Sequence, residues 1–430
     1  MPPTDPDEPV GIYQNNLNDL WVDSDYFLIT PSLAILNTNV PAVETVMLAS
    51  NIQVSAHLIN LVTTNRELQR VLRIGGGLTA LTQRIYSVLP DAFDFLPFFS
   101  TDHIEYSNRL TSANFVSGKY MPVSRNFTGT GTSVFDNTAA FGSSGRLKAI
   151  PMMDIMERGI NSSQNTAHEI SHHWAAELST SLFITSGDGH YSPNSFINSI
   201  LGGQYKAVTN TGPGGGYIKR CFYMDYTNAT PLDKYLMGLI STSAVPPVLV
   251  SSNTLVIPCD GVVSNFRAPV TISNIVAVHG VRTPGPATAQ KDFRLGFVAG
   301  SHNRLLTATE MTFYDLLAAH FTKPLASNYP PPMITYGWTP ATKFFGEGTT
   351  WNSDVLGLIR PTITNVQWLV NGFRIDGTGY PGRTYRLLGS TNLNSWTQVT
   401  NKIAGTNGSF SLHDNSQPRP TTRWYKVSTP

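Results

Sequence analysis

The stretch Asn165–Leu178, NTAHEISHHWAAEL, places three histidines and a glutamate within six positions of a chain that is otherwise poor in charge. Its apolar residues recur with the period of an α-helix, and the preceding NSSQN offers several side chains that can cap a helix. We therefore predict a helix of about four turns, running from Thr166 to about Thr180.

The two faces of this helix differ in character. Ile170, Trp174 and Leu178 share one face, which we expect to pack against a sheet. His168 and His172 share the opposite face, where their neighbours are small residues. The pattern therefore predicts one buried face and one face with chemical function.

His168, Glu169 and His172 form the pattern H-E-x-x-H. Histidines four positions apart on a helix lie about 6 Å apart, so both imidazoles can reach one zinc ion. Glu169 is then placed to take a proton from an activated water. With 10 histidines and 9 glutamates, a shuffled chain of 430 residues would contain about 0.005 such patterns. His173 points away from His172, and we expect it to serve as a polar helix residue or hydrogen-bond partner.

A third protein ligand is needed, because catalytic zinc sites hold the metal with three side chains. Asp233 lies in the apolar stretch TPLDKYLMGLI, where a buried carboxylate needs a cation or several donors. We favour Asp233 for this reason. His190, in the loop sequence GDGHYSP, is the second candidate, and Glu177 and Asp225 are weaker ones.

Hydrolysis of an amide also needs a donor to the oxyanion that forms on the carbonyl. Tyr235, two residues after Asp233, is our first candidate for this catalytic role. Tyr223 and His190 are alternatives.

Composition excludes several classes of protein. The formal net charge is +1 and charged residues make up 13% of the chain, compared with about 25% in an average soluble protein, so we expect no nucleic-acid partner. No apolar stretch reaches the length of about 20 residues needed for a membrane span.

Abundant Asn, Thr, Ser and Gly is typical of secreted proteins, although the chain opens without a recognisable signal peptide. Two cysteines, Cys221 and Cys259, leave their pairing open.

The rest of the chain divides into three parts. Residues 1–57 have no clear role, residues 58–360 form the predicted catalytic domain, and residues 361–430 have the short alternating strands of a small all-β sandwich. Within the middle part the apolar spacing predicts helices over Leu58–Leu89 (two, with a glycine break), Ala229–Ile240 and Thr307–Lys323, and strands over Phe93–Phe99, Arg146–Met156 and Phe293–Gly300.

The ordered set HEISHHW, GDGHYS and TPLDKYLMGLI resembles the zincin metallopeptidases, and in particular a group of secreted bacterial proteins regarded as zinc peptidases. The resemblance covers roughly Asp91–Ile240. It implies an α+β catalytic domain with a mixed sheet, a Zn²⁺ cofactor and a protein or peptide substrate. The end of the chain resembles small β-domains of secreted bacterial proteins, which suggests contact with a cell surface or carbohydrate.

The leading hypothesis is therefore a secreted zinc-dependent endopeptidase, in which Glu169 acts as general base and then as proton donor to the leaving amine. The extended segment Arg146–Met153 is a candidate for holding substrate as an added strand. Two alternatives stay open. One is a non-catalytic surface or adhesion protein with a structural or idle metal site, and the other is a zinc hydrolase of non-peptide amides.

Overall fold

The computed structural model describes residues 42–428, except 65–66, 69–70, 72–75, 102–117, 156–161, 176–177, 184, 186–188, 192–198, 203, 209–215, 221–227, 251–261, 264–265, 323–339, 371 and 417–421. Both cysteines lie outside the described residues, so their pairing stays open. The weaker site candidates Glu177, Tyr223 and Asp225 also lie outside them.

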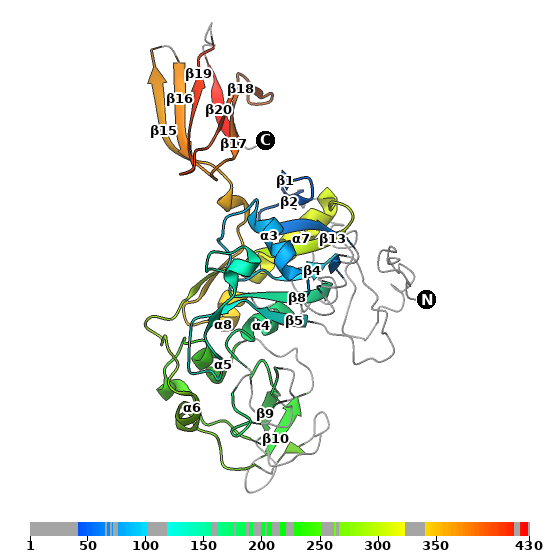
Figure 1. The fold of residues 1–430 in the computed structure, drawn as a ribbon, viewed down its shortest axis with the longest axis vertical. Coiled ribbons are helices and arrows are strands. Elements are labelled where there is room, and N and C mark those ends of the chain that lie inside the picture. The colour runs from blue at the N-terminus through cyan, green and yellow to red at the C-terminus, as the bar shows by residue number, and fades with distance from the viewer. Residues whose placement is uncertain are drawn as a thin grey trace, which may run out of the picture.

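A seven-stranded mixed sheet forms the centre of the main domain (Figure 1), with the order β1-β2-β3-β13-β4-β8-β5. The four inner strands β3, β13, β4 and β8 are parallel, whereas β5 is antiparallel at one edge and β2 and β1 are antiparallel at the other. The sheet begins before Leu58, where we expected the domain to start. The strand bounds are β1 Val46–Ala49, β2 Ile52–Val54, β3 Leu58–Thr63, β4 Phe98–Ser100, β5 Gly118–Pro122, β8 Ala149–Ile155 and β13 Phe297–His302.

The prediction of a helix from Leu58 is wrong for its first six residues, which form strand β3. Leu58, Ile59 and Leu61 are all fully buried, because an inner parallel strand is covered on both faces. A strand of this kind is apolar throughout and cannot be distinguished from a buried helix by its periodicity. The second expected helix is present as α3 (Leu78–Tyr86), which begins after Gly77.

Helices cover both faces of the sheet. Neighbouring residues of the inner strands point to opposite sides, so Phe98 joins a core with residues of α3, while Phe99 joins a core with residues of α4 and α7. The helices on this second side are α4 (Ser162–Ser171), α7 (Ala308–Thr322) and α8 (Ala341–Phe345). The expected helix over Thr307–Lys323 is thus confirmed as α7.

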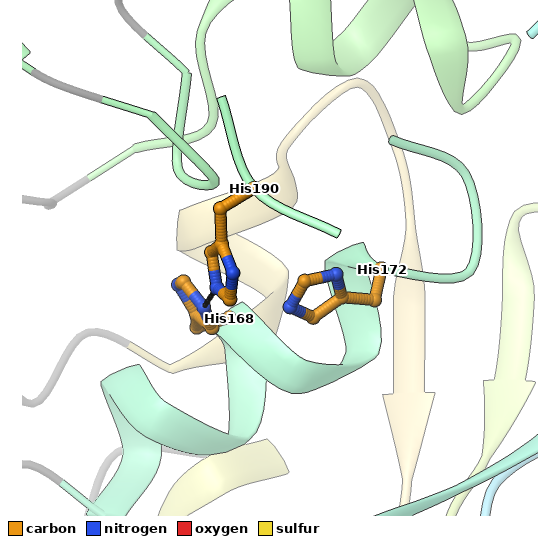
Figure 2. Close-up of side chains that lie close together, drawn as sticks. All are labelled: His168, His172 and His190. Carbon is orange, nitrogen blue, oxygen red and sulfur yellow. Dashed lines mark hydrogen bonds between the residues drawn. The ribbon is translucent and has the colours of Figure 1, made fainter. Parts of the chain in front are cut away.

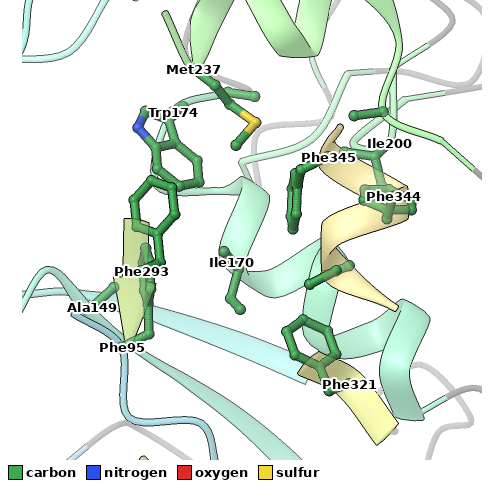
Figure 3. Packing of buried hydrophobic residues seen from close by; sticks show 14 of the residues in the cluster. Phe95, Ala149, Ile170, Trp174, Ile200, Met237, Phe293, Phe321, Phe344 and Phe345 are labelled. Atoms are coloured by element: carbon green, nitrogen blue, oxygen red, sulfur yellow. The ribbon is translucent and has the colours of Figure 1, made fainter. Parts of the chain in front are cut away.

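Helix α4 carries the histidine motif, and its apolar side packs into this core (Figure 3). Ile170, Trp174 and Leu178 are buried as expected, and the Trp174 ring meets Phe95 edge-on with centroids 5.8 Å apart. The helix begins four residues before the expected Thr166, and the prediction that it continues to about Thr180 is wrong, because α4 ends at Ser171. The amide of Trp174 bonds the carbonyl of Ser171, three residues back, so the chain tightens into turns beyond the helix.

Smaller elements surround the main sheet. Helix α5 (Pro231–Leu236) confirms the helix expected around Pro231, and α6 (Ile272–His279) follows it. The remaining elements of this part are β6 Ser124–Arg125, β7 Phe135–Asp136, β9 Gln204–Val208, β10 Gly216–Arg220, β11 Val262–Val263, β12 Asp292–Arg294, β14 Thr350–Asn352 and the 3₁₀ turns Thr138–Phe141, Thr242–Ala244 and Leu356–Leu358.

Residues after Pro361 form two three-stranded antiparallel sheets, β15-β16-β19 and β18-β17-β20, beside the main domain (Figure 1). They have a core of their own that includes Phe373, Tyr385 and Leu412. The strands are β15 Thr362–Leu369, β16 Gly372–Thr378, β17 Thr384–Ser390, β18 Thr397–Ile403, β19 Ser409–Asp414 and β20 Trp424–Ser428. No helix among the described residues is long and apolar enough to cross a membrane.

Candidate metal centre

Three histidines converge at the end of α4 (Figure 2). His168 lies on the helix, His172 lies in the turn directly after it, and His190 comes from a separate loop. One ring nitrogen from each lies within 4.8 Å of the corresponding nitrogens of the other two. The ring centroids of His172 and His190 are 4.7 Å apart, and those of His168 and His190 are 5.1 Å apart.

The tautomer of His168 follows from its hydrogen bond. Its Nδ1 lies 2.9 Å from the carbonyl oxygen of Ile200, which can only accept, so Nδ1 carries the hydrogen. Burial, with a smaller effect of His190, lowers the pKa of His168 to about 3, so the ring is neutral. Its Nε2 therefore carries the electron pair, which here faces Nε2 of His190 in a hydrogen bond of 2.9 Å, and this tautomer is the form of histidine that binds a metal through Nε2.

The distances among the three rings suit a single metal ion. Two nitrogens bound to a tetrahedral zinc ion at 2.0–2.1 Å lie about 3.3 Å apart. In the structure Nε2 of His168 lies 2.9 Å from Nε2 of His190, and the three ligand nitrogens together lie within 4.8 Å. Small rotations of the rings would bring all three to coordination distance. The donor set therefore fits a metal site with three imidazole ligands.

Glu169 lies beside the edge strand of the sheet. It is only 6% exposed, and burial raises the pKa of its carboxyl to about 8. A Cβ atom added to Gly118 of β5 would lie 2.2 Å from Oε1 of Glu169, so the carboxylate rests directly on the backbone of this strand. The absence of a side chain at Gly118 is therefore what gives Glu169 its place.

No family model, curated protein or solved structure matches this chain. The resemblance to the zincins therefore rests on the ordered sequence motifs alone.

Asp233 is not part of this group of three described residues. Its carboxylate is 2% exposed and accepts hydrogen bonds from the Ser199 hydroxyl, the Ile200 amide, and the amide and hydroxyl of Thr230. Burial raises the pKa of Asp233, and these donors oppose the rise. The prediction that this buried carboxylate needs compensation is confirmed, but hydrogen-bond donors supply it.

The hydroxyl of Tyr235, the first candidate for the oxyanion donor, has a structural contact. It accepts a hydrogen bond from the backbone amide of Arg282 at 3.2 Å. The Arg282 side chain in turn donates from Nε to the carbonyl of Leu236 at 2.7 Å, at the end of α5. Tyr235 therefore helps to fix α5, and the described contacts assign it no place beside the three histidines.

The segment Arg146–Met153 is also misplaced for the role expected of it. It contributes to β8, which pairs with β4 on one side and with β5 on the other. Both rows of backbone groups are therefore used within the sheet. Among the described residues β5 is the strand at this edge of the sheet.

Two residues that no sequence motif indicated, Tyr120 and Arg125, support the turn after α4. The hydroxyl of Tyr120 on β5 lies 3.0 Å from Nδ1 of His173, and its ring stacks on that of His172 with centroids 5.8 Å apart. The hydrogen-bond role expected for His173 is thus confirmed. The buried Arg125 donates to the carbonyls of His172 and His173 at 3.4 and 3.2 Å.

We expect Arg125→Met to lower the free energy of unfolding by about 2 kcal/mol or more, because two buried carbonyls lose a charged donor. Urea denaturation measures the change. Arg360→Met is the matched control, since Arg360 is exposed and pairs only with the exposed Glu44 among its described contacts. An equal loss in both variants would contradict the structural role of Arg125.

Proposed function

We propose that this protein is a zinc-dependent endopeptidase that acts outside the cell. The observation that carries the proposal is the convergence of His168, His172 and His190, with Glu169 directly following the first ligand in the sequence. Three imidazoles are a donor set that suits zinc and leaves a fourth coordination position for chemistry. His190 takes the place that we first gave to Asp233.

The chain's own residues divide the work of hydrolysis between them. The three histidines hold the ion, and a bound zinc ion would supply Lewis-acid polarisation of the scissile carbonyl and of the attacking water. Glu169 accepts one proton from the water while the oxygen of the water bonds to the carbonyl carbon. It then passes this proton to the leaving nitrogen as the C–N bond breaks, so the carboxylate returns to its starting state.

Strand β5 favours a peptide over a smaller amide as substrate. Gly118 of this strand touches Glu169 and Tyr120 stacks on His172, so the edge of the sheet runs past the proposed reaction centre. An extended peptide can add to such an edge through backbone hydrogen bonds. A small non-peptide amide would gain nothing from these groups, and activity restricted to such amides would favour that alternative.

We expect Gly118→Ala to lower hydrolysis by about 100-fold, because a displacement of roughly 1 Å in a reacting group has an effect of this size. The new methyl group would push the Glu169 carboxylate aside. The atom that it meets is the end of a flexible side chain, so stability and zinc content should change little. Rates on a peptide substrate and melting temperatures measure the two effects.

Gly285→Ala is the control for this variant, because the nearest atom to its new methyl group is 3.9 Å away. A Gly118→Ala enzyme with the rate of wild type would contradict the placement of Glu169 against β5.

The second candidate function is a non-catalytic surface protein. The observation in its favour is that Trp368 on β15 and Val370, directly after this strand, are 67% and 96% exposed. Neighbouring exposed apolar side chains can form a binding surface. In this alternative the C-terminal module contacts a cell surface or carbohydrate and the metal is idle.

Metal content and hydrolysis measured on the same preparation separate the two functions. About one zinc per chain with cleavage of casein supports the peptidase. Zinc without cleavage of any peptide supports the surface protein, and a folded chain that takes up no zinc contradicts the proposed metal centre.

A further inference from the structure

We infer that Asp233 is a positioning residue of the metal centre, which anchors the turn Ser199–Leu201 and through it orients His168 and His190. The inference rests on the proposed zinc site. It gives a function to a carboxylate that is buried and yet lies outside the group of three histidines.

Asp233 joins two separate parts of the chain. On its own helix it forms the capping box of α5, in which Thr230 and Asp233 each accept from the other's backbone amide. Its two oxygens also reach across to the turn: Oδ1 accepts from the Ser199 hydroxyl, and Oδ2 accepts from the Ile200 amide at 3.1 Å. A helix cap needs only the first set of bonds. The second set ties α5 to the turn.

The turn passes this restraint to His168. The Ile200 amide is held by Asp233, and the carbonyl of the same residue accepts from Nδ1 of His168 at 2.9 Å. This bond selects the tautomer of His168 and sets the direction of its ring. A shift of Ile200 would therefore turn Nε2 of His168 away from the other two ligands.

The turn also restrains the loop that carries His190. The amide of Tyr191, the next residue, donates to the carbonyl of Leu201 at 2.9 Å. The amide of Leu201 donates to the Ser199 hydroxyl at 3.2 Å, and this hydroxyl donates to Asp233. Two of the three ligands, from segments 22 residues apart, thus depend on one turn.

A carboxylate accepts from every one of the donors described around this position. The four groups that surround Asp233 (the Ser199 hydroxyl, the Ile200 amide and the amide and hydroxyl of Thr230) all donate to it. Asparagine has nearly the same shape, but its NH₂ group has to replace Oδ1, because the two backbone amides at Oδ2 can only donate. The bond with the Ser199 hydroxyl is then reversed, and the charge that strengthens all four bonds is lost. Asp233→Asn therefore changes the bonding with little change in volume.

The test compares Asp233→Asn with Thr230→Ala, which breaks the cap of α5 and leaves the bonds from Asp233 to the turn. The zinc dissociation constant of each is measured by competition with a chelator. We expect Asp233→Asn to weaken zinc binding by about 10–100-fold, the range for lost outer-shell partners, and Thr230→Ala to stay within about twofold of wild type. Ser199→Ala serves as a second variant if Asp233→Asn does not fold, and it should weaken zinc binding in the same direction.

A second readout does not depend on metal. In ¹⁵N-labelled, metal-free protein, the Nδ1–H signal of His168 should be present in wild type and in Thr230→Ala, and should weaken or shift in Asp233→Asn. Wild-type zinc affinity in both Asp233→Asn and Ser199→Ala would overturn the inference and leave the proposed function intact. A wild-type protein that binds no zinc would instead overturn the proposed function, and the inference with it.

Discussion

Glu169→Gln is expected to lower peptide hydrolysis by about 10²–10⁴-fold, the contribution of a positioned general base, while zinc stays bound. Glutamine keeps the shape of the side chain in its place against Gly118, but it cannot accept the proton of the attacking water. Steady-state rates on a peptide substrate measure the loss, and metal analysis on the same sample shows whether the site is intact.

The matched control is Glu44→Gln, which makes the same chemical change at an exposed ion pair with Arg360. It should keep the wild-type rate. Hydrolysis retained in Glu169→Gln would show that another group activates the water, and would contradict the role of Glu169 as general base. A loss of zinc together with activity would mean that Glu169 is needed to build the site and would contradict a purely catalytic role.

His190→Ala is expected to remove zinc from the protein under conditions in which wild type retains it. The substitution takes away one of three converging nitrogens, and its effect should exceed the 10–100-fold weakening typical of an outer-shell change. Metal content by mass spectrometry, after dialysis against a weak chelator, measures the loss. Hydrolysis should disappear in parallel.

His413→Ala is the control for a lost imidazole, because His413 lies on β19 of the C-terminal module. It should retain zinc in full. Asp233→Asn provides the decisive comparison, since we expect it to bind zinc more weakly than wild type but more tightly than His190→Ala. Full zinc content in His190→Ala with complete loss in Asp233→Asn would restore Asp233 as the third ligand.

Local patterns were sufficient to predict the helix with the motif and its buried side. The spacing of Ile170, Trp174 and Leu178 predicted which side chains enter the core, and all three are buried. Only Ile170 lies on α4, since the helix ends at Ser171, and Trp174 and Leu178 are buried in the turns beyond it. The helix boundaries were predicted less well, since the turn after Ser171 depends on contacts with Arg125 and Tyr120 from other strands.

The choice between two readings of the same local pattern needed the tertiary structure. The apolar pattern from Leu58 to Thr63 is compatible with either a buried helix or a buried strand. The segment is a strand because it pairs with β2 on one side and β13 on the other. Asp233 presented the same problem. Burial predicted that its charge needs compensation, and both a metal and a set of hydrogen-bond donors can supply this.

By itself the sequence determined that His168, Glu169 and His172 lie within about one helical turn of one another. The helix itself ends at Ser171, one residue before His172. Only the tertiary structure decided which distant residue completes the group. His190 reaches His168 because the Ser199–Leu201 turn holds both segments, through the carbonyls of Ile200 and Leu201. The acceptors in these bonds are backbone carbonyls, which every residue has, so no pattern of side chains in the sequence could predict them.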